Sequence, residues 1–274
     1  MEPWQEGYVE TNGIRMHYWR TGDGGKPPVV LSHGATDNGL CWRRTARALE
    51  ADYDVIMVDV RGHGLSDKPA PDYGPRQSAA DLAGLIRGLD IAPPHLIGHS
   101  MGGEISANCA ADFPDLPRSL TIIDSGFLSN SGPFRGSADQ AEERVAQAHA
   151  RVAENRALGV EGLIARCRDE NPGWHEDELE PWAQSKLQVS PDYVLFFAQE
   201  KRPWQEIIGA IHCPLLLLVG EPHLDSHTAW DAAVQATGIW REGQLTHIAN
   251  AGHNVQRDRW DEFMARITAW LAAH

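Results

Sequence analysis

Short runs of apolar residues alternate with amphipathic stretches through the first half of the chain. Residues 28–32 and 55–60 are apolar and rich in β-branched side chains, as in the buried strands of a parallel sheet. Leu82, Leu85, Ile86 and Leu89 recur at helical spacing. The expected strands are 14–20, 28–32, 55–60, 95–98 and 120–123, and the expected helices are 42–49, 77–89 and 102–113. This alternation predicts an α/β fold with a mostly parallel, doubly wound sheet and helices on both faces.

The pattern changes between residues 127 and 210, where amphipathic helical segments occur without a clear strand. The helices expected there are 138–157, 161–168, 178–187 and 191–200. Strand patterns resume at 214–219 and 245–249, and a last helix is expected at 257–271. Ligands of open α/β sheets bind at the carboxyl ends of the strands. We therefore expect a core domain of residues 1–126 and 211–274, with a helical cap of residues 127–210 inserted over that edge.

Composition and charge argue against several classes of function. The 274 residues include 24 Lys and Arg against 38 Asp and Glu, which gives a formal net charge of −14. Binding to nucleic acid or to anionic membranes needs surplus cations, so neither partner is expected. The first residues carry acids and lack the apolar stretch of a secretory signal. The four cysteines form no CxxC pair, which favours reduced thiols and a cytoplasmic protein.

The strongest chemical motif is Gly-His-Ser-Met-Gly at residues 98–102, between an expected strand and an expected helix. It fits G-x-S-x-G, in which a sharp, strained turn lifts the serine hydroxyl above the sheet. Gly98 and Gly102 leave room for the close approach of the backbone at this turn. The following helix points its free N–H groups at the site, which favours negative charge developing there. The motif predicts that Ser100 is a nucleophile.

A serine hydroxyl near neutral pH needs a base, and histidine has a suitable pKa for that task. The chain has 13 histidines, so position along the sequence must select among them. His253 follows the last expected strand, within the segment Asn-Ala-Gly-His-Asn. That position predicts His253 as the base.

Taken together, these motifs resemble those of the α/β-hydrolase superfamily over nearly the whole chain. His33 and Gly34 follow the expected strand 28–32, and Trp42 comes nine residues after His33. Residues 59–67 read Asp-Val-Arg-Gly-His-Gly-Leu-Ser-Asp, similar to the family's D-x-R-G-x-G-x-S turn. The resemblance implies an α/β-hydrolase fold with a cap, in which Ser100 attacks and His253 accepts its proton.

The same resemblance implies an oxyanion hole formed by two backbone amides. These are the amides of Met101, directly after the nucleophile, and of Ala35, directly after Gly34. Backbone donors depend little on the side chain, so alanine is acceptable at position 35. His33 is expected to support this loop.

The carboxylate that orients the histidine has more than one candidate. In most of the superfamily it follows the strand matching 214–219, in a pattern like G-x-x-D, but His223 holds that position here. Asp225 lies two residues later, and Glu221 is also near. Asp124 ends the next strand after the nucleophile, the strand end at which zearalenone-type lactonases, similar in this respect, hold their acid. We prefer Asp124, with Asp225 and Glu221 as alternatives.

Substrate contacts are predicted from position alone. Trp182 and Trp204 lie in the expected cap, and Trp42 lies just beyond the oxyanion loop. Aromatic walls suit an apolar or ring-bearing substrate. Asp37 directly follows the loop and is predicted to contact a polar substrate group.

No cofactor or metal is expected. The nucleotide-binding patterns G-x-x-x-x-G-K-[ST] and G-x-G-x-x-G after a strand do not occur. His223, Asp225 and His227 have a spacing that would suit a metal on an extended loop, but short clusters of this kind on acidic surfaces are usually solvated.

These features predict a serine hydrolase that cleaves a small carboxylic ester or lactone through an acyl-enzyme. Two other functions remain open on the same scaffold. A cofactor-free dioxygenase would use His253 and Asp124 to deprotonate its substrate for attack by oxygen. A ligand receptor would keep the triad and turn over slowly, because a fold does not fix a function.

Overall fold

One eight-stranded sheet forms the centre of the computed structural model, which describes residues 4–69, 73–128, 139–199 and 201–274. The strand order is β1-β2-β4-β3-β5-β6-β7-β8; the β1–β2 and β2–β4 pairs are antiparallel, and the other five pairs are parallel. The strands are β1 Gln5–Thr11, β2 Ile14–Arg20, β3 Pro28–Ser32, β4 Asp54–Val58, β5 His95–His99, β6 Ser119–Ile123, β7 Leu215–Val219 and β8 Gly243–His247.

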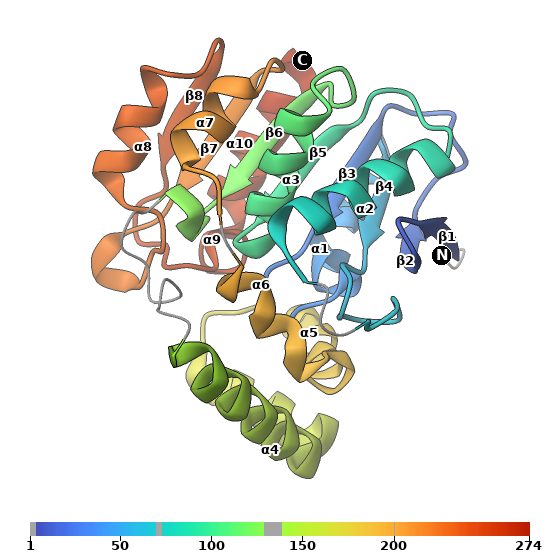
Figure 1. Ribbon diagram of the computed structural model, residues 1–274, viewed down its shortest axis with the longest axis vertical. Coiled ribbons are helices and arrows are strands. Elements are labelled where there is room, and N and C mark those ends of the chain that lie inside the picture. Colours follow the sequence, from blue (N-terminus) through green and yellow to red (C-terminus); the bar gives the residue numbers. More distant parts are fainter. Residues whose placement is uncertain (1–3, 70–72, 129–138, 200) are drawn as a thin grey trace.

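Helices cover both faces of this sheet (Figure 1). One hydrophobic cluster holds side chains of α2, α3, α7 and α8, and a second holds those of α1, α9 and α10. The bounds are α1 Arg43–Leu49, α2 Pro75–Gly88, α3 Met101–Asp112, α7 Trp204–Ala210, α8 Trp230–Thr237, α9 Val255–Asp258 and α10 Trp260–Ala273. The predicted doubly wound, mostly parallel α/β sheet is therefore confirmed.

Strand β7 shows why a continuous apolar run was the correct signal. All five of its side chains are buried. Leu215, Leu217 and Val219 pack in the first cluster, whereas Leu216 and Leu218 pack in the second. Successive side chains of a strand point to opposite faces, so a strand covered on both faces is apolar throughout.

Helix α7 was not predicted, the expected helix 257–271 is divided into α9 and α10, and three further elements also differ from the sequence-based expectation. Strand β1 was not predicted, because its side chains are largely exposed and it pairs only with β2, at the edge of the sheet. Helix α8 was also missed. Strand β8 ends at His247, earlier than the predicted 249, and most of its side chains are partly or fully exposed. All three lie at or near the sheet edges, where half-exposed residues weaken the apolar pattern.

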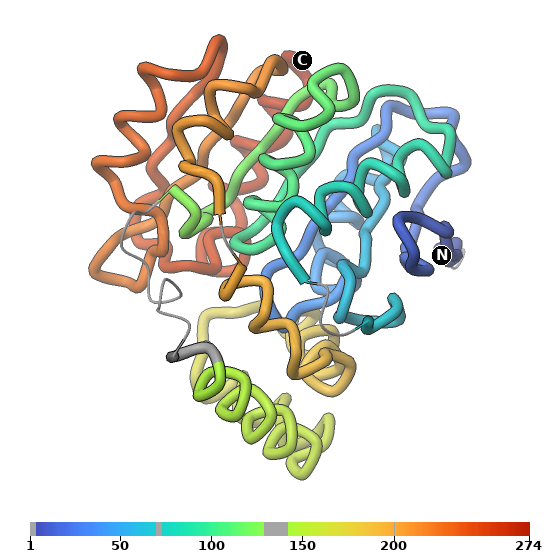
Figure 2. The backbone as a smooth tube through the Cα atoms, in the orientation of Figure 1, coloured from blue at the N-terminus to red at the C-terminus, as the bar shows by residue number. Residues whose placement is uncertain are grey.

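Between β6 and β7 the chain forms a run of helices, in the region where the sequence predicts the cap. They are η2 Gly126–Leu128, α4 Asp139–Glu170, α5 Glu176–Gln188, η3 Pro191–Val194, α6 Leu195–Ala198 and α7. Gly159 interrupts α4 with φ 64° and ψ −177°, which separates the two expected helices 138–157 and 161–168. Residue 138 and the side chains of 139–141 lie outside the described residues. Figure 2 shows α4 at the end of the molecule away from both termini.

The last helix of this region packs into the core, as do Phe127 and Leu128 of η2 and Phe196 of α6. Trp204, Ile207 and Ile208 of α7 belong to the same core cluster as the side chains of α2 and α3. Helix α7 therefore lies with the sheet layers, and the division of the chain at residue 210 stays a prediction.

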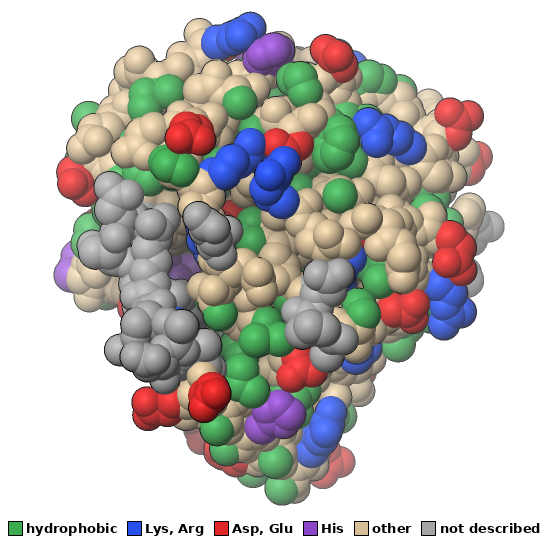
Figure 3. All heavy atoms as spheres, viewed as in Figure 1, with side chains coloured by type: hydrophobic (Ala, Val, Ile, Leu, Met, Phe, Trp, Pro, Cys, Tyr) green, Lys and Arg blue, Asp and Glu red, His purple; other side chains and the backbone are tan. Residues whose placement is uncertain are grey.

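The visible surface has no dominant apolar area. On the face shown in Figure 3, hydrophobic side chains are scattered among charged and polar ones. No helix within the described ranges has the length and apolar character needed to cross a membrane.

Candidate active site

Ser100 lies at a strained turn between β5 and α3. Its backbone has φ 52° and ψ −116°, a conformation that side-chain-bearing residues rarely adopt. A Cβ atom at Gly98 would meet the carbonyl oxygen of Gly102 at 2.2 Å, and one at Gly102 would meet that of Ser32 at 2.3 Å. Only glycine fits at these two positions. Close packing of the backbone thus holds Ser100 in a strained conformation, which is the geometry of a nucleophile elbow.

His253 and Asp124 are joined by a short hydrogen bond. The His253 Nδ1–H donates to Asp124 Oδ2 at 2.7 Å. The Asp124 side chain is fully buried, whereas that of His253 is 17% exposed and borders the same pocket as Ser100. The bond fixes which imidazole nitrogen carries the proton and leaves Nε2 available to act as an acceptor.

A strap formed by residues 226–228 surrounds the Asp124 carboxylate. The Ser226 hydroxyl donates to it at 2.5 Å, and the backbone N–H groups of His227 and Thr228 donate at 2.8 and 3.1 Å. Burial alone would raise the pKa of Asp124, but the hydrogen bonds from His253 and the strap hold it below its usual range. Asp124 is therefore a buried, ionised carboxylate next to His253.

The two alternative acids lie elsewhere. The Asp225 side chain is 92% exposed, and its carboxylate lies 3.9 Å from His227 Nε2. Glu221 faces two other histidines, with 3.6 Å to His223 and 3.5 Å to His247. Of the three candidate acids, Asp124 is the one that the structure places at hydrogen-bonding distance from His253.

The loop of residues 34–37 borders the pocket beside Ser100, since a Cβ atom at Gly34 would lie 3.4 Å from Ser100 Cβ. His33 supports it: its Nδ1–H donates to the Gly34 carbonyl at 2.8 Å, while its Nε2 accepts from Val60 N at 3.1 Å. Thr36 adopts a left-handed backbone, φ 64°, and its N–H donates to His63 Nε2 at 3.3 Å. Burial and the neighbouring His33 lower the pKa of His63 to about 3, so it stays a neutral acceptor.

The two predicted oxyanion donors border this region. Ala35 lines the pocket, and Met101 is the first residue of α3. The first N–H groups of a helix have no partner within the helix. Met101 directly follows Ser100 in the chain and Ala35 lines the same pocket, and their roles as oxyanion donors stay predictions.

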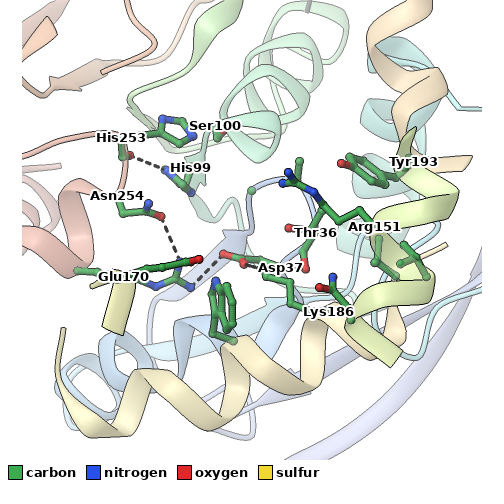
Figure 4. Close-up of a pocket in the computed structure, with 18 of the residues that line it drawn as sticks. Thr36, Asp37, His99, Ser100, Arg151, Glu170, Lys186, Tyr193, His253 and Asn254 are labelled. Carbon is green, nitrogen blue, oxygen red and sulfur yellow. Dashed lines mark hydrogen bonds and ion pairs between the residues drawn. The ribbon is translucent and has the colours of Figure 1, made fainter. Parts of the chain in front are cut away.

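The pocket itself has a volume of about 620 Å³ and lies between the sheet edge and the cap (Figure 4). Its lining mixes aromatic and charged side chains. The aromatic ones are Trp174, Trp182, Tyr193 and Phe197; the cationic ones are Arg151, Arg166, Lys186 and Arg257; the acidic ones are Asp37, Glu154 and Glu170. Four cations are notable in a chain with a formal charge of −14.

The predicted substrate contacts divide into three groups. Trp182 lines the pocket as expected. Trp42 and Trp204 are 2% and 1% exposed and pack in the two hydrophobic clusters, so the expected substrate contact is wrong for both. Asp37 borders the pocket but is 5% exposed, and both of its oxygens are bound by cations of this chain. That pairing gives Asp37 a structural role, and its contact with a substrate stays a prediction.

Two histidines that the sequence did not indicate as partners of His253 flank its ring. The His227 ring stacks on it, with centroids 3.6 Å apart and planes inclined by 25°. The His99 ring lies 4.7 Å away and its Nε2–H donates to the His253 carbonyl at 2.9 Å. Burial, followed by the His253 charge, lowers the pKa of His99 to about 3. The same two causes lower the pKa of His227.

Metal binding gains no support from the geometry. Among the described residues, no three His, Cys, Asp or Glu side chains are grouped so as to hold an ion. Asp225 lies near His227, and Glu221 near His223, as separate pairs.

Comparison with known proteins identifies the class. Residues 29–266 match the model of the alpha/beta hydrolase family, so the chain belongs to this family. N-formylmaleamate deformylase of Pseudomonas putida is 39% identical over 279 residues, covering 97% of this chain and 96% of that protein. A 2-(acetamidomethylene)succinate hydrolase of Mesorhizobium japonicum is 43% identical over 116 residues, 42% of this chain and 41% of that one.

Solved structures agree on the fold. The crystal structure of an E-2-(acetamidomethylene)succinate hydrolase superposes with a TM-score of 0.79 at 22% identity, covering 98% of this chain and 99% of that one. The chain is an enzyme of the alpha/beta hydrolase family, and the predicted fold and family resemblance are confirmed.

Proposed function

We propose that Ser100, His253 and Asp124 form a catalytic triad that hydrolyses a small acyl compound. The Asp124–His253 hydrogen bond at the wall of the pocket that holds Ser100 carries this proposal. A buried, ionised carboxylate that fixes the histidine tautomer is what a serine nucleophile needs from its base.

In this mechanism, Ser100 Oγ attacks the carbonyl carbon while His253 Nε2 takes the hydroxyl proton. The amides of Ala35 and Met101 stabilise the oxyanion. The bond to the leaving group breaks as His253 returns the proton to that group, which leaves an acyl-enzyme. Water, deprotonated by His253, attacks the acyl-enzyme and releases the acid and a free Ser100.

An ester or lactone is the first candidate for the bond that is cleaved. An N-acyl bond is the second, and it is favoured by a specific observation: a relative that is 39% identical over 97% of this chain is named N-formylmaleamate deformylase. The same proton transfer from His253 to the leaving atom serves an oxygen or a nitrogen.

The pocket lining also favours a substrate that carries a carboxylate. Lys186 and Arg257 bind Asp37, and Arg166 binds Asn155 and Glu154. Within the described part of the chain, Arg151 has no ion-pair partner, and it extends from α4 into the pocket (Figure 4). We infer that Arg151 binds a substrate carboxylate beside the aromatic wall formed by Trp182.

Intact-mass measurement after treatment with a fluorophosphonate probe tests the nucleophile. Wild type should gain a single adduct, and Ser100→Ala should gain none. An adduct on both proteins, or none on either with probes of decreasing size, contradicts the proposal.

Hydrolysis assays then determine whether the enzyme cleaves an ester bond or an N-acyl bond. A small N-formyl or N-acetyl carboxylate, the matching ester and a neutral ester of similar size are compared at equal concentration. Turnover that disappears in Ser100→Ala supports the triad, and the ratio of rates identifies the bond. Oxygen consumption that persists in Ser100→Ala indicates the dioxygenase, and tight binding with negligible turnover indicates the receptor.

A further inference from the structure

We propose that Lys186 is a positioning residue that holds the oxyanion loop in its catalytic geometry and links it to the cap. The inference rests on the proposed function, in which the Ala35 amide of this loop stabilises the oxyanion. Lys186 lies on the cap helix α5, whereas the loop follows β3 of the sheet.

Two contacts fix the loop to Lys186. Its ammonium donates to the Thr36 carbonyl at 3.1 Å and to Asp37 Oδ1 at 2.7 Å. These are the two residues directly after Ala35, so Lys186 fixes the chain just beyond the Gly34–Ala35 peptide, whose carbonyl His33 holds from the other side. Lys186 is 7% exposed, and little water competes for either contact.

The loop needs such support because its backbone is strained. Thr36 is β-branched and has φ 64°, a combination that is an outlier for such residues. His63 holds its N–H from the sheet side, and Lys186 holds its carbonyl from the cap side. The peptide groups on the two sides of Thr36 are thus held by partners from different parts of the chain. A strained conformation persists only where its surroundings determine it in this way.

Asp37 completes the arrangement as a buried anion between two cations. Arg257 Nη2 donates to its second oxygen at 3.0 Å. Burial would raise the pKa of Asp37, but the charges of Arg257 and Lys186 hold it well below its usual range. Arg257 also donates to Asn254, the residue after His253, at 3.2 Å. One buried ion cluster therefore joins the oxyanion loop, the histidine loop and the cap.

The cap side of this link reaches the substrate. Lys186 Nζ lies 4.8 Å from the ring centre of Trp182, which lines the pocket one turn earlier on α5. A second bond ties α5 to the same loop, from Asn38 Nδ2 to Gln188 Oε1 at 2.8 Å. The helix that forms the aromatic wall is thus the helix that positions the oxyanion loop.

The test compares Lys186→Met with Lys201→Met. Methionine keeps most of the lysine stem and removes its charge and donors. Lys201 forms an ion pair of the same kind with Glu104 at 2.6 Å, part-buried, but touches neither the oxyanion loop nor Asp37. Both variants lose one such pair, but Lys186→Met alone also removes the contacts to the oxyanion loop and to Trp182, and the split between kcat and KM separates these two effects.

Three quantities are measured on the wild type and both variants: kcat, KM and the affinity for a boronic acid, which forms a tetrahedral adduct on the serine. In Lys186→Met we expect kcat and the boronic-acid affinity to fall together by about 10- to 100-fold. This is less than the 10²–10³-fold loss of an oxyanion donor itself, because the amide is displaced rather than removed. KM should change far less, and Lys201→Met should resemble wild type in all three.

Other outcomes overturn the inference. A raised KM with unchanged kcat identifies Lys186 as a substrate ligand, and equal losses in the two variants identify a merely structural ion pair. If Lys186→Met does not fold, Lys186→Gln, which keeps a donor without the charge, is held to the same criteria. Wild-type hydrolysis that is absent, or that survives in Ser100→Ala, overturns the proposed function and this inference with it.

Discussion

Asp124 and His253 lie 129 positions apart in the sequence, yet their side chains share a 2.7 Å hydrogen bond. The contact forms because β6 ends beside the loop that follows β8, on the same edge of the sheet, with β7 between them. The later carboxylate, Asp225, follows β7 but points into solvent. Strap residues 226–228 bend over Asp124 instead of supplying an acid of their own.

Replacing each carboxylate by its amide separates the two candidate acids. We expect Asp124→Asn to lower kcat by about 10⁴-fold, because an amide in this position favours the wrong histidine tautomer. Asp225→Asn should keep activity close to wild type, because the side chain is exposed. Steady-state rates for both variants at pH 7 provide the measurement, and the reverse order would assign the acid to Asp225.

The stack of His227 on His253 predicts a second effect. Burial lowers the pKa of His227, so its neutral ring can lie against the imidazolium that His253 forms during the reaction. His227→Ala removes the stack and frees the His253 ring to turn, while the backbone N–H at position 227 still donates to Asp124. We expect kcat to fall about threefold to tenfold, as for an aromatic pair of 0.5–1.5 kcal/mol.

His227→Phe is the matched control. Phenylalanine keeps a flat ring at the same place and cannot carry a proton, so kcat should return toward the wild-type value. Equal losses in the alanine and phenylalanine variants would show that the ring's nitrogen atoms, rather than its face, are what the site uses.

Much of the fold was predictable because the relevant signals are local. The G-x-S-x-G turn, the apolar strands and the change to helical periodicity after residue 127 each depend on neighbours in the chain. The glycines of this turn also have a clear structural cause, because the space at Gly98 and at Gly102 does not admit a Cβ atom. The edge elements β1 and α8 were not predicted, because half-exposed residues give weak patterns.

The pocket was less predictable because its charges pair across long distances. Asp37 was visible beside the oxyanion loop, but nothing nearby in the sequence indicated that Lys186 and Arg257 would bind it. For Trp42 and Trp204 the sequence predicted a substrate contact that the structure does not contain. A large aromatic residue near a site fits the core as well as the substrate, and here the core holds both.

Arg151 gives a direct test of substrate charge. Arg151→Met should raise KM about 10- to 100-fold for a substrate with a carboxylate, the effect of losing a charged hydrogen bond of 1.5–3 kcal/mol. A neutral ester should be nearly unaffected, as should labelling of Ser100 by the fluorophosphonate. Arg156→Met, on the same helix but outside the pocket lining, is the control. An equal change of KM for charged and neutral substrates would contradict carboxylate binding.

Buried neutral histidines predict that mild acid destabilises the fold. Burial lowers the pKa of His63 and His99 to about 3 and that of His95 to about 4. In the unfolded chain these groups take up protons near pH 6.5, whereas the folded state does not. The unfolded state therefore binds more protons below that pH, and the free energy of unfolding falls as the pH falls.

The pH range separates this effect from that of the carboxylates. Asp37 and Asp124 have lowered pKa values, so their stabilising contribution is lost only as the pH falls toward 4 and below. Glu178 acts in the opposite direction, because burial raises its pKa, but it is one group against several histidines. Between pH 7.5 and 5.5 the histidines should dominate, with each fully buried one contributing about 1 kcal/mol.

Urea unfolding at pH 7.5 and 5.5, on wild type and on His95→Gln, measures this contribution. His95 lies at the start of β5, away from the pocket, and its Nδ1 bonds the Ser119 hydroxyl at 2.8 Å. Glutamine keeps a polar partner for Ser119 but does not titrate. The loss of stability between the two pH values should shrink by about 1 kcal/mol in the variant, whatever its stability at pH 7.5. The same loss in both proteins would mean that His95 takes up its proton while folded, and that burial does not keep it neutral.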